Sequence, residues 1–231
     1  MLRINPMTSA EGAKQYYTKA LSREDYYIQG QEIVGQWHGK GASLLGLSGD
    51  VDRERFFALV DNLRPDNGKP LTARTKENRR VGYDFTFSVP KSVSLLYALT
   101  KDERLLAAFR SSAQDTMTEM EAAVKTRVRK GRGDEQERLT GNMLWADFIH
   151  TVGRPVGGVP DPDLHMHCVV MNATFDRKEQ RWKAAEFHDL KRDAPYYDAA
   201  FHARLAERMR GLGFGIERNG KRWDVAGMPR E

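Results

Sequence analysis

One short stretch, residues 163–172, constrains the fold of this chain more than any other. It reads Asp-Leu-His-Met-His-Cys-Val-Val-Met-Asn and follows a segment rich in glycine and proline, residues 153–162. Apolar and β-branched residues bounded by such a loop predict a buried β-strand. Side chains in a strand alternate between the two faces of a sheet, so His165 and His167 point the same way. Two imidazoles side by side on one face suit a divalent metal or a phosphate.

A second apolar run lies upstream and ends in a third histidine. Residues 143–149 read Met-Leu-Trp-Ala-Asp-Phe-Ile and are followed by His150. If the two runs pair as antiparallel strands, His150 can meet His165 and His167. Three neutral imidazoles can hold a divalent cation and leave coordination positions open for a substrate. Histidines that stand alone are more often structural, and we interpret the remaining ones that way: His38, His188 and His202.

Composition sets bounds on the compartment and the partners of the chain. Its 231 residues, 40% of them hydrophobic, are enough for a proper core in one large domain, or in one and a half. A formal net charge of +5 and a pI of about 9.3 make a polyanionic partner plausible, although many basic proteins bind none. Cys168 is the single cysteine, which excludes an internal disulfide and fits a reducing compartment. Because no apolar run reaches the roughly 18 residues of a membrane span and no secretory signal is present, we expect a cytoplasmic protein without membrane insertion.

The remaining pattern predicts helices and strands in mixed order. We expect strands at residues 2–7, 81–87 and 181–184, and a hairpin that turns at Asn219-Gly220. We expect helices from an N-cap at Thr8 to about Leu21, over residues 52–63, after a cap at Ser88, and over residues 102–129 and 193–212. Residues 130–137 read as a charged loop. This pattern predicts a fold that contains both helices and strands.

Tyrosines are concentrated near the N-terminus, in the doublets Tyr16-Tyr17 and Tyr26-Tyr27. Aromatic packing would be the ordinary explanation for either doublet alone. A phenol with a pKa of about 10 is a weak nucleophile at neutral pH. A metal and a carboxylate base beside it would help it attack phosphorus, giving a phosphotyrosine link to DNA and a free 3′-hydroxyl.

Asp84 and a set of cations complete the candidate site. Asp84 lies inside an alternating strand, where burying a carboxylate alone is costly, so it should have a partner. It could orient a ligand histidine or accept the proton of a nucleophile. Lys91 lies at the start of a predicted helix, whose N-terminus is a natural phosphate site. The remaining basic cluster consists of Arg74, Lys76, Arg79 and Arg80. Such a cluster is by default solvated surface, and the more specific interpretation is that it contacts phosphates.

Two short matches to known motifs are rejected. Ser88-Val89-Pro90-Lys91 fits an S-x-x-K acylase pattern, but its Ser-Asp-Asn and Lys-Thr-Gly partners are absent from the sequence. Residues 215–221 come near a phosphate-binding loop, but Arg222 stands where serine or threonine is needed and the context is a hairpin. No nucleotide-driven motor is encoded in this chain.

These motifs, in this order, resemble one family across nearly the whole chain. They are the two tyrosine doublets, Trp37-His38-Gly39-Lys40-Gly41 with Leu45-Gly46-Leu47-Ser48-Gly49, the run from Asp84 to Ser94, and His150 with His165-Met166-His167. The chain resembles the MobF-type conjugative relaxases, which belong to the HUH class of single-strand DNA endonucleases. The resemblance implies an α+β fold, with a central antiparallel β-sheet flanked by helices and the N-terminal helix placed over the metal.

The resemblance also implies roles for individual residues. Tyr16 matches the initial nucleophile and Tyr26 the tyrosine of a later transfer, while the division of labour with Tyr17 and Tyr27 varies within the doublets. Asp84 matches the strand carboxylate of the family. The metal ligands would be His150, His165 and His167, and the expected ion is Mg²⁺ or Mn²⁺.

The function implied by the resemblance is site- and strand-specific nicking and rejoining of DNA at a plasmid transfer origin, through a covalent 5′-phosphotyrosine. The expected partners are single-stranded origin DNA with an adjacent hairpin, and relaxosome accessory proteins, and we expect a monomer. Family proteins are typically much longer and carry a helicase. We therefore expect residues 1–231 to be a relaxase domain excised from such a protein.

Three other functions are weighed against this one. A rolling-circle replication initiator shares the paired histidines, but its tyrosine usually follows the histidine motif, whereas here the doublets come first. A non-catalytic repressor of its own origin would bind duplex DNA tightly without cleaving it. A zinc hydrolase of small molecules would have no need of the basic loops.

Overall fold

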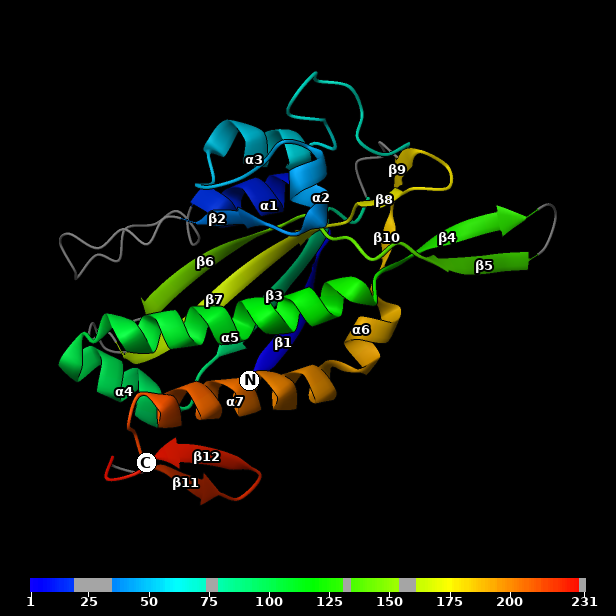
Figure 1. The fold of residues 1–231 in the computed structure, drawn as a ribbon. Coiled ribbons are helices and arrows are strands. Elements are labelled where there is room, and N and C mark those ends of the chain that lie inside the picture. The colour runs from blue at the N-terminus through cyan, green and yellow to red at the C-terminus, as the bar shows by residue number, and fades with distance from the viewer. Residues whose placement is uncertain (19–34, 74–78, 131–133, 154–160, 229–231) are drawn as a thin grey trace.

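A five-stranded sheet organises the molecule (Figure 1). The computed structural model describes residues 1–18, 35–73, 79–130, 134–153 and 161–228. Every neighbouring pair of strands in this sheet is antiparallel, which confirms the predicted α+β class. In spatial order the strands are β1 (Leu2–Met7), β3 (Gly82–Ser88), β7 (Pro162–Met171), β6 (Trp145–Val152) and β2 (Gln36–His38).

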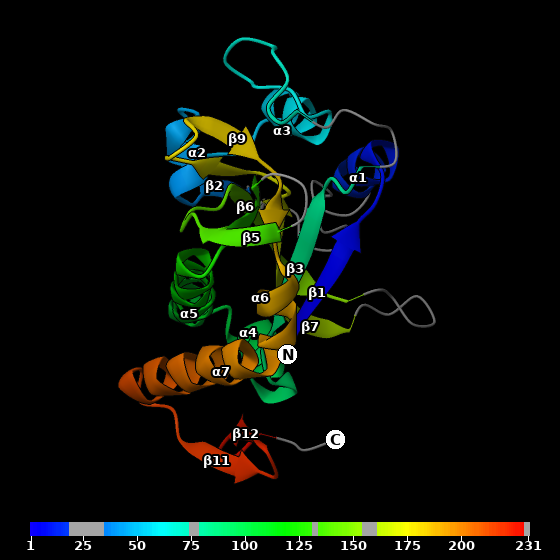
Figure 2. The ribbon, with the colours of Figure 1, turned by 90° about the vertical axis from the view of Figure 1, so that its right-hand side faces the viewer.

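Alternation along the strands produces two apolar clusters, one on each face of the sheet. Leu164 and Met166 of β7 point into the cluster on the long-helix face, whereas Val169 and Met171 point into the cluster on the short-helix face. The long-helix face is covered by α4 (Lys91–Thr100), α5 (Glu103–Ala122), α6 (His188–Arg192) and α7 (Ala194–Gly211). The short-helix face is covered by α1 (Ala10–Tyr16), α2 (Lys40–Leu44) and α3 (Arg53–Val60). Figure 2 shows α5 and α7 on one side of β1 and β3, and α1 on the other.

Two predicted helix caps were wrong. Ser9, not Thr8, caps α1, because the Ser9 hydroxyl accepts a hydrogen bond from the Gly12 amide at 3.1 Å. Ser88 is the last residue of β3, and α4 starts after Pro90 without a side-chain cap. The helices predicted over residues 52–63 and 193–212 are confirmed as α3 and α7. The part of the first predicted helix beyond residue 18 lies outside the described residues.

A hairpin replaces the end of one predicted helix and a predicted loop. The helix expected over residues 102–129 ends at Ala122, and β4 (Lys125–Lys130) and β5 (Asp134–Leu139) follow as an antiparallel pair. Thr126 and Val128 are buried in alternation, a period of two that the charged residues around them conceal. β10 (Ala185–Glu186) pairs with β4, and the β4–β5 hairpin projects from the body as an arm (Figure 1).

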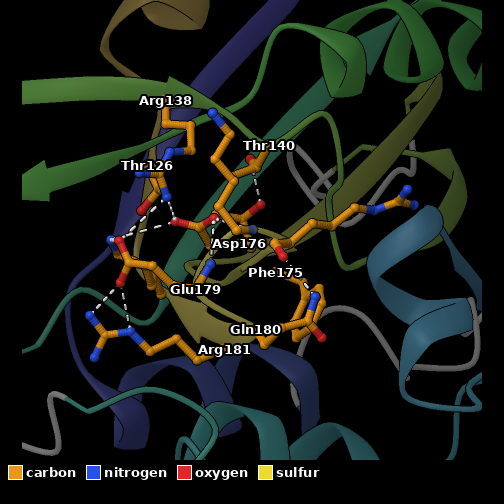
Figure 3. Close-up of polar contacts among 12 residues, drawn as sticks. Thr126, Arg138, Thr140, Phe175, Asp176, Glu179, Gln180 and Arg181 are labelled. Atoms are coloured by element: carbon orange, nitrogen blue, oxygen red, sulfur yellow. Dashed lines mark hydrogen bonds and ion pairs between the residues drawn. The ribbon is translucent and has the colours of Figure 1, made fainter.

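A polar network ties the arm to a second hairpin (Figure 3). This hairpin consists of β8 (Thr174–Asp176) and β9 (Arg181–Lys183), which confirms the strand predicted at residues 181–184. Asp176 is 1% exposed, and its carboxylate accepts hydrogen bonds from Arg138 of β5 at 2.6 Å and from the Lys178 amide at 3.0 Å. Hydrogen bonds from Lys183 and then Arg181 lower the pKa of Glu179 in the connecting turn to about 2.

The last strands form the predicted hairpin, β11 (Ile216–Asn219) and β12 (Arg222–Val225). Gly220 in its turn has a φ of 57°, a conformation that favours glycine. The hairpin is fastened to α4, because the Ser92 hydroxyl donates to Asp224 Oδ1 at 2.9 Å. Among the described residues, none of the helices combines the length and the apolar character needed to cross a membrane.

Candidate active site

Three histidines converge on the short-helix face of the sheet. In the register of β6 and β7, His150 lies directly opposite His165, and His167 lies two residues further along the same face. The ring centroids of His165 are 5.1 Å from those of both His150 and His167, and the remaining pair is 5.2 Å apart. Each half-buried ring can offer one nitrogen within 4.8 Å of the others. The structure therefore brings together the three histidines that the sequence singled out.

Oxygen atoms occupy the Nδ1 side of two of these rings. His165 Nδ1 lies 2.8 Å from the Asp163 carbonyl oxygen, and His167 Nδ1 lies 2.8 Å from Asp84 Oδ2. An acceptor at Nδ1 favours the tautomer that carries the proton there, which leaves the Nε2 lone pair for a cation. Partners of this kind also fix the orientation of metal-binding rings. The donor set fits a divalent transition metal, because such ions bind imidazole readily.

The last residue of α1 reaches this cluster. Ala13 and Tyr17 are buried in the short-helix cluster, which sets the rotation of α1 so that Tyr16 lies beside the histidines. The Tyr16 hydroxyl donates to Asp84 Oδ2 at 2.8 Å and lies 2.8 Å from His167 Nδ1. Since Asp84 Oδ2 is also 2.8 Å from His167 Nδ1, the three polar atoms form a triangle. A phenol, a carboxylate and an imidazole are thus in mutual hydrogen-bond contact.

Asp84 has the partner that its place in a strand required. It is 8% exposed, and on the same face of β3 the Thr86 hydroxyl lies 3.4 Å from His167 Nδ1. Its neighbours Tyr83 and Phe85 point into the long-helix cluster, as the alternation predicted. The carboxylate of Asp84 makes no ion pair with a lysine or arginine among the described residues. It is therefore available to accept a proton from Tyr16.

Tyr17 lies apart from this group. Its ring stacks on Phe56 with centroids 4.5 Å apart, and it meets Phe57 and Phe148 edge-on. Burial raises the pKa of Tyr17, and the negative charge of Asp52 adds to the effect. The structure thus places Tyr17 in the apolar cluster under α3 and not beside the histidines. The second doublet falls outside the described residues: Tyr26 and Tyr27.

Comparison with known proteins identifies the family. The family model described as TrwC relaxase matches residues 10–231. The chain belongs to the TrwC relaxase family. The multifunctional conjugation protein TraI of Escherichia coli strain K12 is 32% identical over 241 residues, and a second Escherichia coli TraI is 33% identical over 243 residues. Both alignments cover 100% of this chain, which spans 13% of the length of those relatives.

Solved relaxase structures share the fold of this chain. The metal-bound structure of the conjugative relaxase TrwC in complex with oriT DNA is 31% identical, with a TM-score of 0.85. A copper-bound structure of the same relaxase with oriT DNA is also 31% identical, with a TM-score of 0.86. Each comparison covers 100% of this chain and 77% of the TrwC chain. The sheet, its helices and their order are therefore those of a relaxase.

The basic residues predicted to contact DNA are engaged in different parts of the chain. Lys91 Nζ donates to Asp161 Oδ1 and to the Pro162 carbonyl, so it holds the chain at the start of β7. The Arg79 guanidinium donates to the Val60 carbonyl, and burial lowers the pKa of Arg79. Two further candidates lie outside the described residues: Arg74 and Lys76.

Arg79 and Arg80 border a cleft of about 850 Å³ at the end of the sheet where β3 begins. The Arg80 guanidinium donates to the Tyr83 hydroxyl at 2.6 Å and lies over the ring of that tyrosine. The lining also includes residues of β4, β9 and β10, with cations that the sequence analysis missed: Arg127, Arg181 and Lys183. Each of these cations is paired with a glutamate of the same lining, Arg127 with Glu186 at 2.8 Å and Arg181 and Lys183 with Glu179 at 2.5 and 2.9 Å.

Proposed function

We propose that this relaxase domain nicks and rejoins one DNA strand at a specific site in a plasmid transfer origin, with Tyr16 as the first nucleophile. The observation that carries the proposal is the triangle of Tyr16 Oη, Asp84 Oδ2 and His167 Nδ1, in which each pair is 2.8 Å apart. The relatives supply the substrate class, since TrwC has been solved with oriT DNA and the TraI proteins are conjugation proteins.

In the first transfer, the Tyr16 oxygen bonds to the scissile phosphorus while the bond from phosphorus to the 3′-oxygen breaks. The Tyr16 proton passes to Asp84, which already accepts the phenol hydrogen bond. The leaving 3′-oxygen takes a proton from water and becomes a free 3′-hydroxyl. The 5′-phosphate stays on Tyr16 as a phosphodiester, so the bond energy is retained and the reverse reaction can rejoin the strand.

His150, His165 and His167 would hold a divalent cation, which polarises the scissile phosphate when it is bound. Three nitrogen donors favour a transition metal such as Mn²⁺ over Mg²⁺, which prefers oxygen ligands. The contribution of the protein is orientation: the Asp163 carbonyl and the Asp84 carboxylate hold two of the three rings.

The DNA of this relaxase is proposed to combine a single-stranded cleavage site with an adjacent hairpin. TrwC has been solved with a 27-mer DNA comprising the recognition hairpin and the cleavage site, at 29% identity to this chain and a TM-score of 0.83. Among the described cations of the cleft, Arg79 and Arg80 make no ion pair with a carboxylate, so these two would contact phosphates, and such contacts position DNA without reading its sequence. Relaxosome accessory proteins, a monomeric state, a cytoplasmic location and a longer relaxase–helicase stay predictions.

The test is covalent adduct formation. The protein is incubated with single-stranded oligonucleotides that span candidate origins, with Mn²⁺, and separated by denaturing electrophoresis. We expect a slowly migrating protein–DNA adduct with one sequence, its loss in EDTA, and its return when Mn²⁺ is restored. Tight duplex binding without any adduct would favour the origin-binding repressor, and cleavage undiminished by EDTA would contradict the metal role.

A further inference from the structure

The edge strand β1 places two polar side chains beside the active site that the mechanism above does not use. Figure 2 shows β1 at the edge of the sheet, next to β3. Directly opposed residues of neighbouring strands put their side chains on the same face. Arg3 lies opposite Thr86, which in turn lies opposite His167, and Asn5 lies opposite Asp84. Arg3 therefore shares a row of the sheet with a candidate metal ligand.

On the short-helix face of the sheet, the side chains in these rows are apolar toward β6 and polar toward β1. In the same rows, β6 contributes Ala146 and Phe148 to the apolar cluster beneath α1 and α3. Toward β1 the positions become polar, and both Arg3 and Asn5 are exposed. The alternate residue Leu2 is buried in the long-helix cluster. Polar residues on the open side of an edge strand are ordinary, but here they extend the active-site surface up to its free edge.

The Arg3 guanidinium is available for a ligand. No ion pair or side-chain hydrogen bond joins it to another described residue, whereas Lys91 is bound to Asp161. Neighbouring strands are about 4.8 Å apart, so the backbones of Arg3 and His167 are separated by about 10 Å. The long arginine side chain can shorten that gap. A phosphate next to one held at the histidines would therefore come within reach of Arg3.

We propose that Arg3 and Asn5 bind the backbone of the single strand beside the scissile phosphate, with the Arg3 guanidinium on a neighbouring phosphate. Arginine suits this task because its planar guanidinium can donate two parallel hydrogen bonds to one phosphate. Contacts of this kind fix the register of a strand. The site would hold the strand so that the scissile bond faces Tyr16, and this inference rests on the proposed nicking function.

The first test measures the salt dependence of binding. Arg3→Gln and the control Arg210→Gln, an exposed arginine of α7, are compared in a Tyr16→Phe background, which prevents cleavage. Binding of a fluorescent single-stranded origin oligonucleotide is followed by anisotropy at several salt concentrations. Loss of one phosphate contact should reduce the slope of log K against log salt by about 0.7. We expect this change and weaker binding for Arg3→Gln, and neither for Arg210→Gln.

The second test locates the phosphate. Oligonucleotides carry one uncharged methylphosphonate at successive positions around the cleavage site. One position adjacent to the scissile phosphate should weaken binding to the Tyr16→Phe protein but cause no further loss in Arg3→Gln, because the two changes remove the same contact. Asn5→Ala should weaken binding less than Arg3→Gln.

The outcomes separate this inference from the function beneath it. If Arg3→Gln keeps the parent slope, or if its effect adds fully to every methylphosphonate, the phosphate contact is refuted. Adduct formation by the wild-type protein is measured on the same oligonucleotide. When adducts form, such a result overturns only the role of Arg3; when no origin oligonucleotide yields an adduct, the proposed function falls and this inference falls with it.

Discussion

Two histidine–aspartate pairs lie on opposite faces of the same sheet. His167 Nδ1 lies 2.8 Å from Asp84 Oδ2 on the short-helix face, and His38 Nε2 lies 3.0 Å from Asp147 Oδ2 on the long-helix side. Asp84 is 8% exposed and Asp147 is 0% exposed. Their distances and burial are therefore alike, and the groups around each pair make the difference.

Asp147 is surrounded by donors that neutralise it. Arg110 of α5 donates to both carboxylate oxygens at 3.1 and 3.2 Å, and the Gln36 amide donates at 3.0 Å. Burial alone would raise the pKa of Asp147, but hydrogen bonding and charge from His38 and Arg110 lower it below its usual value. These contacts fasten β2 and α5 to β6 through the Asp147 carboxylate.

Asp84 instead accepts a hydrogen bond from a phenol and contacts a candidate metal ligand. No lysine or arginine among the described residues pairs with the Asp84 carboxylate, and its Oδ2 already accepts the hydrogen bond of the Tyr16 hydroxyl. In this sheet, the histidine–aspartate pair that also binds an arginine links structural elements. The pair whose aspartate accepts a hydrogen bond from a phenol, with no arginine or lysine on it among the described residues, is the one that could serve catalysis.

Of substitutions in the two histidine–aspartate pairs, Asp84→Asn is expected to have the largest effect. Removing the proton acceptor should slow adduct formation by about 10²- to 10⁴-fold, the usual contribution of a general base. Single-turnover adduct formation on origin DNA measures the rate, and thermal unfolding checks the fold. A rate equal to that of the wild-type protein would show that Asp84 is not the acceptor.

Asp147→Asn should lower the stability of the fold and leave the rate of adduct formation nearly unchanged. The substitution leaves Arg110 without its counter-charge, and breaking a partly buried ion pair of this kind should cost about 2 to 3 kcal/mol of unfolding free energy. Urea denaturation measures the loss. The adduct rate of the folded protein should stay near the wild-type value, and a collapse of that rate with unchanged stability would erase the distinction between the two pairs.

His202 extends the comparison to a histidine whose carboxylate neighbour, Asp198, is 3.5 Å away. Burial, and then the positive charge of the N-terminal amino group, lower the pKa of His202 to about 4. Between that value and the unfolded pKa of about 6.5, the unfolded chain binds a proton that the folded protein does not. The free energy of unfolding should therefore fall as the pH drops from about 6.5 to 4, by about 2 kcal/mol.

Denaturation at several pH values measures that fall, with His202→Gln as the matched variant. The variant should lose the part of the pH dependence that His202 contributes. An unchanged pH profile in the variant would mean that His202 is not the group responsible.

The smallest effect is expected for Tyr17→Phe. Its ring packs in the apolar cluster against Phe56, and phenylalanine preserves that packing. Adduct formation should stay near the wild-type rate, in contrast to the complete loss expected for Tyr16→Phe. Loss of the adduct in Tyr17→Phe alone would reverse the roles assigned within the doublet.

The sequence predicted part of the active site, because the placement of its histidines and of Asp84 depends on strand periodicity. His165 and His167 must share a face, and Asp84 must point away from Tyr83, whatever else the chain does. The meeting with His150 needed the register of two strands, which the apolar runs only suggested.

Other parts depend on long-range packing that no short pattern reveals. Tyr16 and Tyr17 are adjacent, and a helix turns by about 100° per residue, so their side chains point in different directions. Which of the two faces the histidines depends on which one is buried in the core, and the sequence does not show that. His38 contacts Asp147 of another strand, a partner that the sequence around His38 does not reveal. The β4–β5 arm was missed because Thr126 and Val128, the buried positions of β4 among the residues whose burial is described, lie between charged residues.

The most direct test of the central claim is the identity of the tyrosine that carries DNA after the first transfer. The adduct is isolated, digested with nuclease and protease, and analysed by tandem mass spectrometry for the modified residue. We expect a nucleotide on Tyr16. A nucleotide on Tyr17 or in the second doublet, with Tyr16 unmodified, would contradict it.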